Sequence, residues 1–416
     1  MLGALRPVVS LLCGVALVLL GSGLLNTLIP LRGHVLGFSD GLLGMLTSAY
    51  FGGFLLGTFL APWMIRRVGH IRAFALCASV CACIALLHAL SDNAWLWMLL
   101  RVCIGIALVG LYTVIESWLN AQSAPAQRGR IFAVYMIVNL SALTLAQQLL
   151  RFSAEQAFVL FVLVALLICA STLPVLWTRQ SQPQVQTTPR LQLRRLFALA
   201  PSAGVGALLS GLAMGAFWGL LPIYAAHRGL GRDQIAGFMS VAIAGGAALQ
   251  WPLGRLSDRH DRRVALMVVG ALACVIALLM LLPSGRVQWP GYVAIFLYGG
   301  AVFSVYPIVV AHLLDCLAAQ DVLGASSSVL LINGFGSALG PLIAGFAMGA
   351  FGASSLFAWF ALTEGLIAVY AGYRYRIFRR IQVEGANFAP MLRTTPAALE
   401  MHAPASGDGI ADNRQV

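Results

Sequence analysis

Twelve apolar stretches dominate the sequence and constrain its fold more than any other feature. Each holds about 20 residues or more, the length that a helix needs to cross the hydrocarbon core of a bilayer. Open strands are excluded there, because their unpaired backbone groups are too costly in lipid. The pattern predicts an all-α membrane protein with twelve transmembrane helices. The stretches lie roughly at residues 8–30, 42–65, 73–91, 94–118, 131–150, 156–177, 203–225, 233–253, 264–283, 290–313, 324–349 and 354–373.

Composition and charge placement indicate lipid, rather than water or nucleic acid, as the main surroundings of the chain. Hydrophobic residues make up 60% of the 416 residues and charged residues only 10%, whereas a soluble protein keeps about a quarter of its residues charged. The net charge of +12 comes from short arginine patches between apolar stretches, which does not indicate a nucleic-acid partner. The sequence shows no cluster of metal ligands, and we expect no metal and no cofactor.

The distribution of arginine predicts the orientation in the membrane. If the N-terminus is cytoplasmic, twenty arginines fall on the cytoplasmic side, five on the opposite side, and Arg101 within a stretch. Cytoplasmic segments of membrane proteins carry the excess of basic residues. We therefore predict a multi-pass protein of the bacterial inner membrane with both termini in the cytoplasm.

A polar segment at residues 178–202 divides the stretches into six plus six. It is basic and rich in Pro, Gln and Thr. We predict an N-terminal six-helix bundle at 1–177, this cytoplasmic linker, a C-terminal six-helix bundle at 203–380, and a disordered cytoplasmic tail at 381–416.

The two halves resemble each other weakly at an offset near 193 residues. Tyr112 and Tyr306, for example, occupy matching places in the fourth stretch of each half. Two similar bundles predict two pseudo-symmetric halves with a cavity between them near the bilayer midplane, and alternating access by rocking of one half against the other.

One motif resembles a known family. The motif reads Gly254-Arg255-Leu256-Ser257-Asp258-Arg259 and is followed by Arg262-Arg263. It is similar to the loop signature Gly-x-Leu-x-Asp-Arg-x-Gly-Arg-Arg of the major facilitator superfamily. The second Gly of that signature is replaced by Asp261. The first-half copy is degraded, with Arg66 in place of the acid. Two further pairs also resemble superfamily patterns: Arg101 with Gly105, and Glu116 with Arg128-Gly129-Arg130. Five segments resemble the YcaD-like branch of these transporters, at residues 25–34, 115–120, 128–136, 250–259 and 304–312.

The resemblance implies a cytoplasmic gate between the halves. Asp258 would cap the N-terminal end of the fifth stretch, Arg259 would pair with Asp315, and Arg67 would pair with Glu116. The alternative is an ordinary solvated loop that serves only topology. The predicted gate residues are Arg67, Glu116, Arg128, Arg130, Gly254, Asp258, Arg259, Arg262 and Asp315.

Ionisable side chains inside the stretches are functional candidates, because burying them in a membrane is costly. Arg101 either holds a substrate carboxylate or is a structural cation bonded to carbonyls of the first stretch. Glu364 and His312 are proton-coupling candidates, and a purely structural role is open for both. Glu116 is a third coupling candidate, although its place near the cytoplasmic end fits the gate better.

Polar and aromatic side chains of several stretches fill out the predicted substrate cavity. The candidates are Asn26, Tyr50, Arg101, Tyr112, Asn139, Trp218, Gln250, Tyr298, Tyr306 and Asn333. The stretches that contribute most of them carry no acid at mid-membrane depth. This absence favours a neutral or anionic small organic substrate over a cationic drug.

The sequence predicts a monomeric secondary transporter that moves such a solute through the lipid bilayer, coupled to H⁺. A non-transporting receptor or scaffold, a lipid or amphiphile flippase, and a multidrug exporter are the alternatives. An enzyme is not predicted, because no paired catalytic carboxylates, metal-ligand cluster or phosphate-cradling loop is present in the sequence.

Overall fold

The computed structural model describes residues 9–123, 127–152, 157–177, 193–282, 289–317 and 322–377, together with Met391. Most of these residues are helical, and none of them forms a strand. The helices are α2 (Val9–Val35), α3 (Asp40–Val68), α4 (His70–Leu90), α5 (Ala94–Gln122), α6 (Arg128–Gln148), η2 (Leu149–Phe152), α7 (Ala157–Ala170), α8 (Thr172–Leu176), α9 (Leu193–Leu199), α10 (Pro201–His227), α11 (Arg232–Arg259), α12 (Arg262–Leu279), α13 (Trp289–Asp315), α14 (Val322–Phe351) and α15 (Ser355–Ile377).

The prediction of twelve membrane-spanning helices is confirmed. Twelve helical segments of the described chain are long and apolar enough to cross a bilayer, with α6 continuing into η2 and α7 into α8. Several helices run past the apolar stretches that predicted them. The largest extension is in α11, which continues through the motif to Arg259, so that residues expected in a loop are helical.

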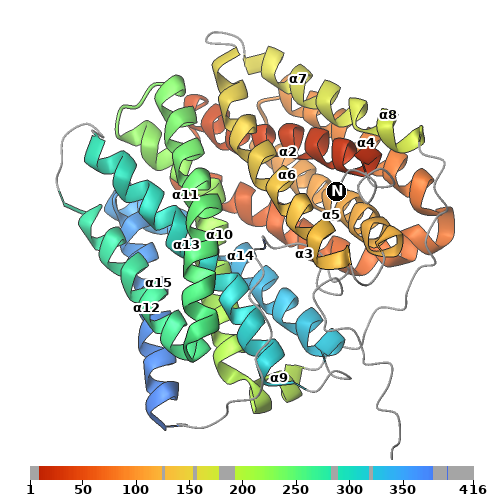
Figure 1. Ribbon diagram of the computed structural model, residues 1–416. Helices are drawn as coiled ribbons and strands as arrows, with labels where there is room; N and C mark the ends of the chain where they lie inside the picture. The colour runs from red at the N-terminus through yellow and green to blue at the C-terminus, as the bar shows by residue number, and fades with distance from the viewer. Residues whose placement is uncertain are drawn as a thin grey trace, which may run out of the picture.

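The membrane-spanning helices form two bundles, one from each half of the chain (Figure 1), and each half contributes six of the twelve spans. Close helix pairs recur at matching places in the two bundles. In the α3–α5 pair, a Cβ at Gly53 or Gly105 would collide with the backbone of the partner helix. In the α11–α13 pair, a Cβ at Gly245 or Gly299 would collide in the same way. Gly53 and Gly245 are 192 residues apart, and Gly105 and Gly299 are 194 apart. The predicted offset is therefore also a structural repeat.

The two bundles meet closely at one end of the molecule. Gly44 of α3 lies against the backbone of Pro341 in α14, and a Cβ there would not fit. At the second crossing, Gln148 of α6 donates a hydrogen bond to Ser240 of α11, whose hydroxyl donates to the carbonyl of Thr144 at 3.1 Å. The arginine distribution predicts that this end lies at the outer face of the membrane.

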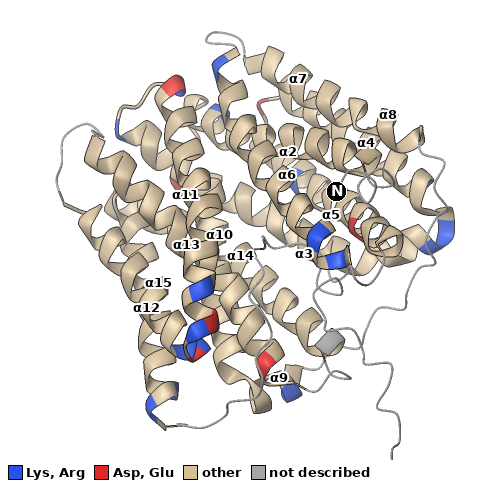
Figure 2. Cartoon of the chain, viewed as in Figure 1, with Lys and Arg blue, Asp and Glu red and all other residues tan. Residues whose placement is uncertain are grey.

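The opposite end carries the charged helix termini. Figure 2 shows blue and red segments together where α11 ends, α12 begins and α15 ends, on the side of the molecule where α9 lies. The hydrogen bonds and glycine contacts that join the two bundles lie at the other end, within the described ranges. The described residues therefore form a pair of bundles that is closed at the predicted outer end.

Candidate substrate cavity

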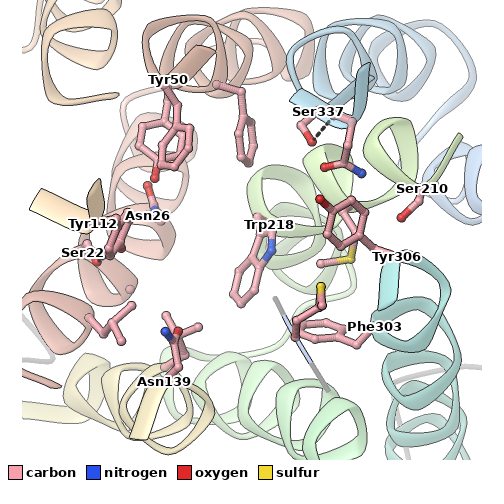
Figure 3. Close-up of a pocket in the computed structure, with 18 of the residues that line it drawn as sticks. Ser22, Asn26, Tyr50, Tyr112, Asn139, Ser210, Trp218, Phe303, Tyr306 and Ser337 are labelled. Atoms are coloured by element: carbon pink, nitrogen blue, oxygen red, sulfur yellow. Dashed lines mark hydrogen bonds between the residues drawn. The ribbon is translucent and has the colours of Figure 1, made fainter. Parts of the chain in front are cut away.

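A cavity lies between the two bundles, with an empty volume of about 1060 Å³ that includes its open mouth. Figure 3 shows Tyr50, Asn26, Tyr112 and Ser22 on one wall, Ser337, Ser210, Tyr306 and Phe303 on the other, and Trp218 between them. The first wall belongs to α2, α3 and α5, and the second to α10, α13 and α14.

The repeat places matching side chains on opposite walls of the cavity. Tyr112 and Tyr306 both line it, and so do Asn139 and Asn333, each pair 194 residues apart. Asn333 donates a hydrogen bond to the carbonyl of Ala207 at 3.1 Å, which fixes its side chain. The two walls therefore offer similar amide and phenol groups to a solute between them.

Seven of the ten predicted cavity residues line this cavity: Asn26, Tyr50, Tyr112, Asn139, Trp218, Tyr306 and Asn333. Gln250 and Tyr298 are both buried but do not line it. The Gln250 amide donates to the Phe303 carbonyl at 3.0 Å, and the Tyr298 ring stacks on Phe360 with centroids 5.1 Å apart. Both side chains point into packing between helices of the second bundle.

Arg101 lies directly behind the cavity wall, with 2% of its surface exposed. Its Nη1 donates to the Asn26 side-chain oxygen at 3.0 Å, and its guanidinium carbon lies 4.3 Å from the centroid of the Tyr50 ring. Its Nε donates to the carbonyl of Leu46 at 3.4 Å. The expected carbonyl partner in the first span is thus replaced by one in the second span, because α5 packs against α3. None of the described carboxylates forms an ion pair with Arg101.

Glu116 lines the cavity from α5, 15 residues after Arg101. At about 1.5 Å per residue, the two groups are roughly 22 Å apart along the helix axis. The Tyr135 hydroxyl donates to a Glu116 oxygen at 2.8 Å, and the Glu116 side chain is fully buried in the protein. The corresponding positions of the second bundle, 194 residues later, are Ile295 and Val310. Arg101 and Glu116 therefore break the pseudo-symmetry of the two bundles.

The other two proton-coupling candidates lie away from the cavity. Glu364 of α15 is fully buried, and neither of its side-chain oxygens has a hydrogen-bond partner among the described residues. It packs where α15 approaches Gly270 of α12. His312 of α13 does not line the cavity and lies near the charged helix ends, where Asp261 and Arg263 are its electrostatic neighbours.

The predicted gate residues of the first half are separated in this structure. Arg67 is exposed and lies over the Trp63 ring at 5.6 Å from its centroid, whereas Glu116 is buried in the cavity wall. Arg130 is exposed at the start of α6, and Arg128 is half-buried there. The Arg67–Glu116 pair is therefore not formed, and it stays a prediction for a state in which this end closes.

In the second half, the acid at the end of α13 has a different partner from the one expected. Asp315 accepts a hydrogen bond from Nε of Arg262 at 3.0 Å, whereas Arg259 was its predicted partner. Asp258 also bonds to Arg262, at 2.6 Å. The cause is the extension of α11, in which Gly254 is buried, together with the short turn into α12. This turn places Arg262, four residues after Asp258 in the chain and at the start of α12, between the two acids.

The turn between α11 and α12 is fixed by a second ion pair. Asp261 caps α12 by accepting from the backbone N–H of Arg263 at 2.9 Å, and its other oxygen accepts from Nη2 of Arg263 at 2.7 Å. Partial burial alone would raise the pKa of Asp261, but the hydrogen bonds from Arg263 outweigh it and hold the pKa below its usual value. The residue that replaces the second Gly of the motif is thus a helix cap.

Replacing Arg262 with Gln is expected to lower the stability of the second bundle by about 2 kcal/mol, because charge-assisted hydrogen bonds to two carboxylates are lost. Arg259→Gln is the matched control and should change stability little. Thermal unfolding of the two purified variants measures the difference. Equal losses in both variants, or a larger loss in Arg259→Gln, would contradict the pairing described here.

Several cavity residues were not predicted from the sequence. They are Ser22, Phe54, Tyr135, Ser210, Phe303, Ser337 and Met391, among others. Ser210 and Ser337 are small side chains in long apolar helices, and nothing in their local sequence distinguishes them from packing residues. Met391 belongs to the predicted tail, for which no function was expected, and its carbonyl accepts a hydrogen bond from the Gln250 amide at 3.4 Å.

Comparison with known families matches both halves separately. The model of the Major Facilitator Superfamily matches residues 11–203 and again residues 203–393. The chain belongs to the major facilitator superfamily. It is therefore a multi-pass membrane protein of a transporter family, and the double match agrees with the internal repeat.

Relatives within the superfamily include proteins called "Uncharacterized MFS-type transporter YcaD". The one from Salmonella heidelberg (strain SL476) is 31% identical over 347 residues, which cover 82% of this chain and 89% of the relative. The one from Escherichia fergusonii is 31% identical over 338 residues, covering 81% and 87%. These matches confirm the resemblance to the YcaD-like branch.

Solved superfamily structures share the fold. The nucleoside transporter NupG is 15% identical, with a TM-score of 0.72 over 89% of this chain and 98% of that one. The human organic anion transporter MFSD10 is 16% identical, with a TM-score of 0.65 over 88% and 99%. At this level of identity the likeness shows the fold, with its two pseudo-symmetric six-helix bundles, and says nothing about substrate.

Proposed function

We propose that the protein is a secondary active transporter that moves a small organic anion across the bacterial inner membrane by alternating access, coupled to H⁺. The observation that carries the proposal is the placement of Arg101. A buried guanidinium with no carboxylate partner among the described residues lies behind Asn26 and Tyr50, which line the cavity. A cation in such a position is costly in a membrane, and an anionic solute in the cavity would offset that cost.

The arrangement of the bundles supports alternating access. The halves are in contact at the predicted outer end, and the predicted gate residues of the first half lie apart at the other end. We propose that this is the inward-open state. Rocking of the bundles would separate Gly44 from Pro341 and bring α11, with Asp258, towards the start of α6. In that outward-open state the predicted gate contacts would form.

The proton would be carried by Glu116. It is the only one of the three predicted coupling acids and bases that lines the cavity, and its bond from Tyr135 links α5 to α6. Protonation would remove the negative charge from the wall that the anion must pass. Both charged groups lie in the first bundle, so that substrate binding and proton uptake would bias the same half against the second.

The purified protein in liposomes with an imposed pH gradient tests the function. Small organic acids and their amides are added one at a time, and a pH-sensitive dye trapped inside reports proton movement. We expect at least one acid to move protons, with its amide moving none. Transport of amides and acids at equal rates, with no proton movement, would contradict both the substrate class and the coupling.

A further inference from the structure

Three metal-ligating side chains meet at the closed outer end, away from the cavity. They are His34 in the last turn of α2, Asp40 at the start of α3, and His227 at the end of α10. One ligand atom of each lies within 4.8 Å of the others. Within the ranges that the structure describes, these are the only three such side chains that come together this closely.

The contacts among the three are already close. Nε2 of His227 lies 2.9 Å from Oδ1 of Asp40, and the rings of His34 and His227 are edge to face with centroids 4.7 Å apart. Tetrahedral Zn²⁺ with bonds of about 2.0–2.1 Å keeps its ligand atoms roughly 3.3 Å apart. Small side-chain rotations would therefore bring all three atoms to one ion, and water could supply a fourth ligand.

The chemistry of the three ligands selects the class of ion. Two imidazole nitrogens and one carboxylate oxygen suit borderline divalent ions such as Zn²⁺ or Ni²⁺, whereas Mg²⁺ and Ca²⁺ prefer oxygen ligands. Asp40 is 11% exposed and His227 34% exposed in their side chains. The group is thus accessible from the outer end, and an ion could enter without passing through the cavity.

The three ligands come from both bundles, so that an ion bound to them would link the two. His34 and Asp40 belong to the first bundle and His227 to the second, and nearby Gly41 and Gly345 are part of the close contact between α3 and α14. We propose that the His34–Asp40–His227 group is a zinc-class metal site that joins the two bundles and holds the outer end closed. A ligand that binds one conformation better shifts the population towards it.

Calorimetric titration of the full chain, without a histidine tag, tests the site with zinc chloride and with magnesium chloride. We expect about one Zn²⁺ per chain, no measurable Mg²⁺, and an increase in melting temperature with zinc. His34→Ala and His227→Ala should each weaken zinc binding at least tenfold. His260→Ala, which removes an exposed histidine at the opposite end of the molecule, should leave it unchanged. No zinc binding by the unaltered chain, or equal binding in all variants, would overturn the site.

The effect on transport rests on the proposed function and is measured separately. Zinc added to the outer face of oriented vesicles should slow transport at least tenfold, and His227→Ala should be insensitive. Full transport at a zinc concentration that saturates the site would overturn the closing role while leaving the metal site intact. Zinc binding in a chain that transports no tested acid would count against the proposed function only.

Discussion

Replacing Arg101 with Gln is expected to weaken binding of an anionic substrate more than tenfold, which corresponds to about 1.4 kcal/mol, and to leave binding of a neutral analogue unchanged. The substitution removes the charge behind Asn26 and Tyr50 and leaves a shorter, neutral side chain that still carries a hydrogen-bond donor. Because Arg101 forms no ion pair with a described carboxylate, its removal leaves no buried acid behind, and the variant should fold.

Arg101→Lys is the matched control for charge. It keeps the cation but loses the planar fork that reaches both Asn26 and the Leu46 carbonyl, so anion binding should fall less than in Arg101→Gln. Tryptophan fluorescence of Trp218, which lines the cavity, offers a binding signal that does not depend on transport. If the anion and its neutral analogue lose affinity equally in Arg101→Gln, the residue has only a structural role.

Replacing Glu116 with Gln is expected to abolish proton-driven accumulation while preserving exchange of substrate across the membrane. The amide mimics the protonated acid and cannot release a proton, so that the protein can still alternate but cannot couple. Accumulation in liposomes with a pH gradient should fall more than tenfold, and counterflow of labelled substrate in the absence of a gradient should continue.

Two further variants test whether the effect is specific to Glu116. One changes the buried acid Glu364, and the other removes the hydrogen bond that Glu116 accepts from Tyr135. Glu364→Gln changes a buried acid that does not line the cavity and should retain proton-driven accumulation. Tyr135→Phe removes the hydroxyl that donates to Glu116 and should keep coupling with an altered pH profile of transport. Loss of accumulation in Glu364→Gln but not in Glu116→Gln would reverse the assignment of the proton site.

The fold and the family could be predicted from the sequence because both depend on features that need no tertiary contact. Apolar length predicts spans without reference to any contact, and the motif at Gly254–Arg259 keeps its spacing whatever the surrounding packing. The repeat offset was also visible, since Tyr112 and Tyr306 mark it directly. The tertiary structure then added Asn139 and Asn333 as a second matching pair on the cavity walls.

The cavity was predictable in part. Asn26, Asn139 and Asn333 stand out as amides in apolar helices, and all three line it. Gln250 stands out in the same way but points into the second bundle, because helix rotation about its axis is set by packing and not by polarity. Ser210 was missed because a small hydroxyl in an apolar helix resembles a packing residue. Only the position of the helices opposite shows that it faces the cavity.

The sequence by itself determined the number of spans, the division into two similar halves and the superfamily, since each depends on local composition or fixed spacing. The tertiary structure alone decided which arginine pairs with Asp315, which acid faces the cavity, and that His34 and Asp40 meet His227. These are contacts between helices that lie up to 193 residues apart in the chain. Such contacts depend on helix rotation, on the exact end of α11 and on the relative tilt of the bundles, which no single stretch of sequence encodes.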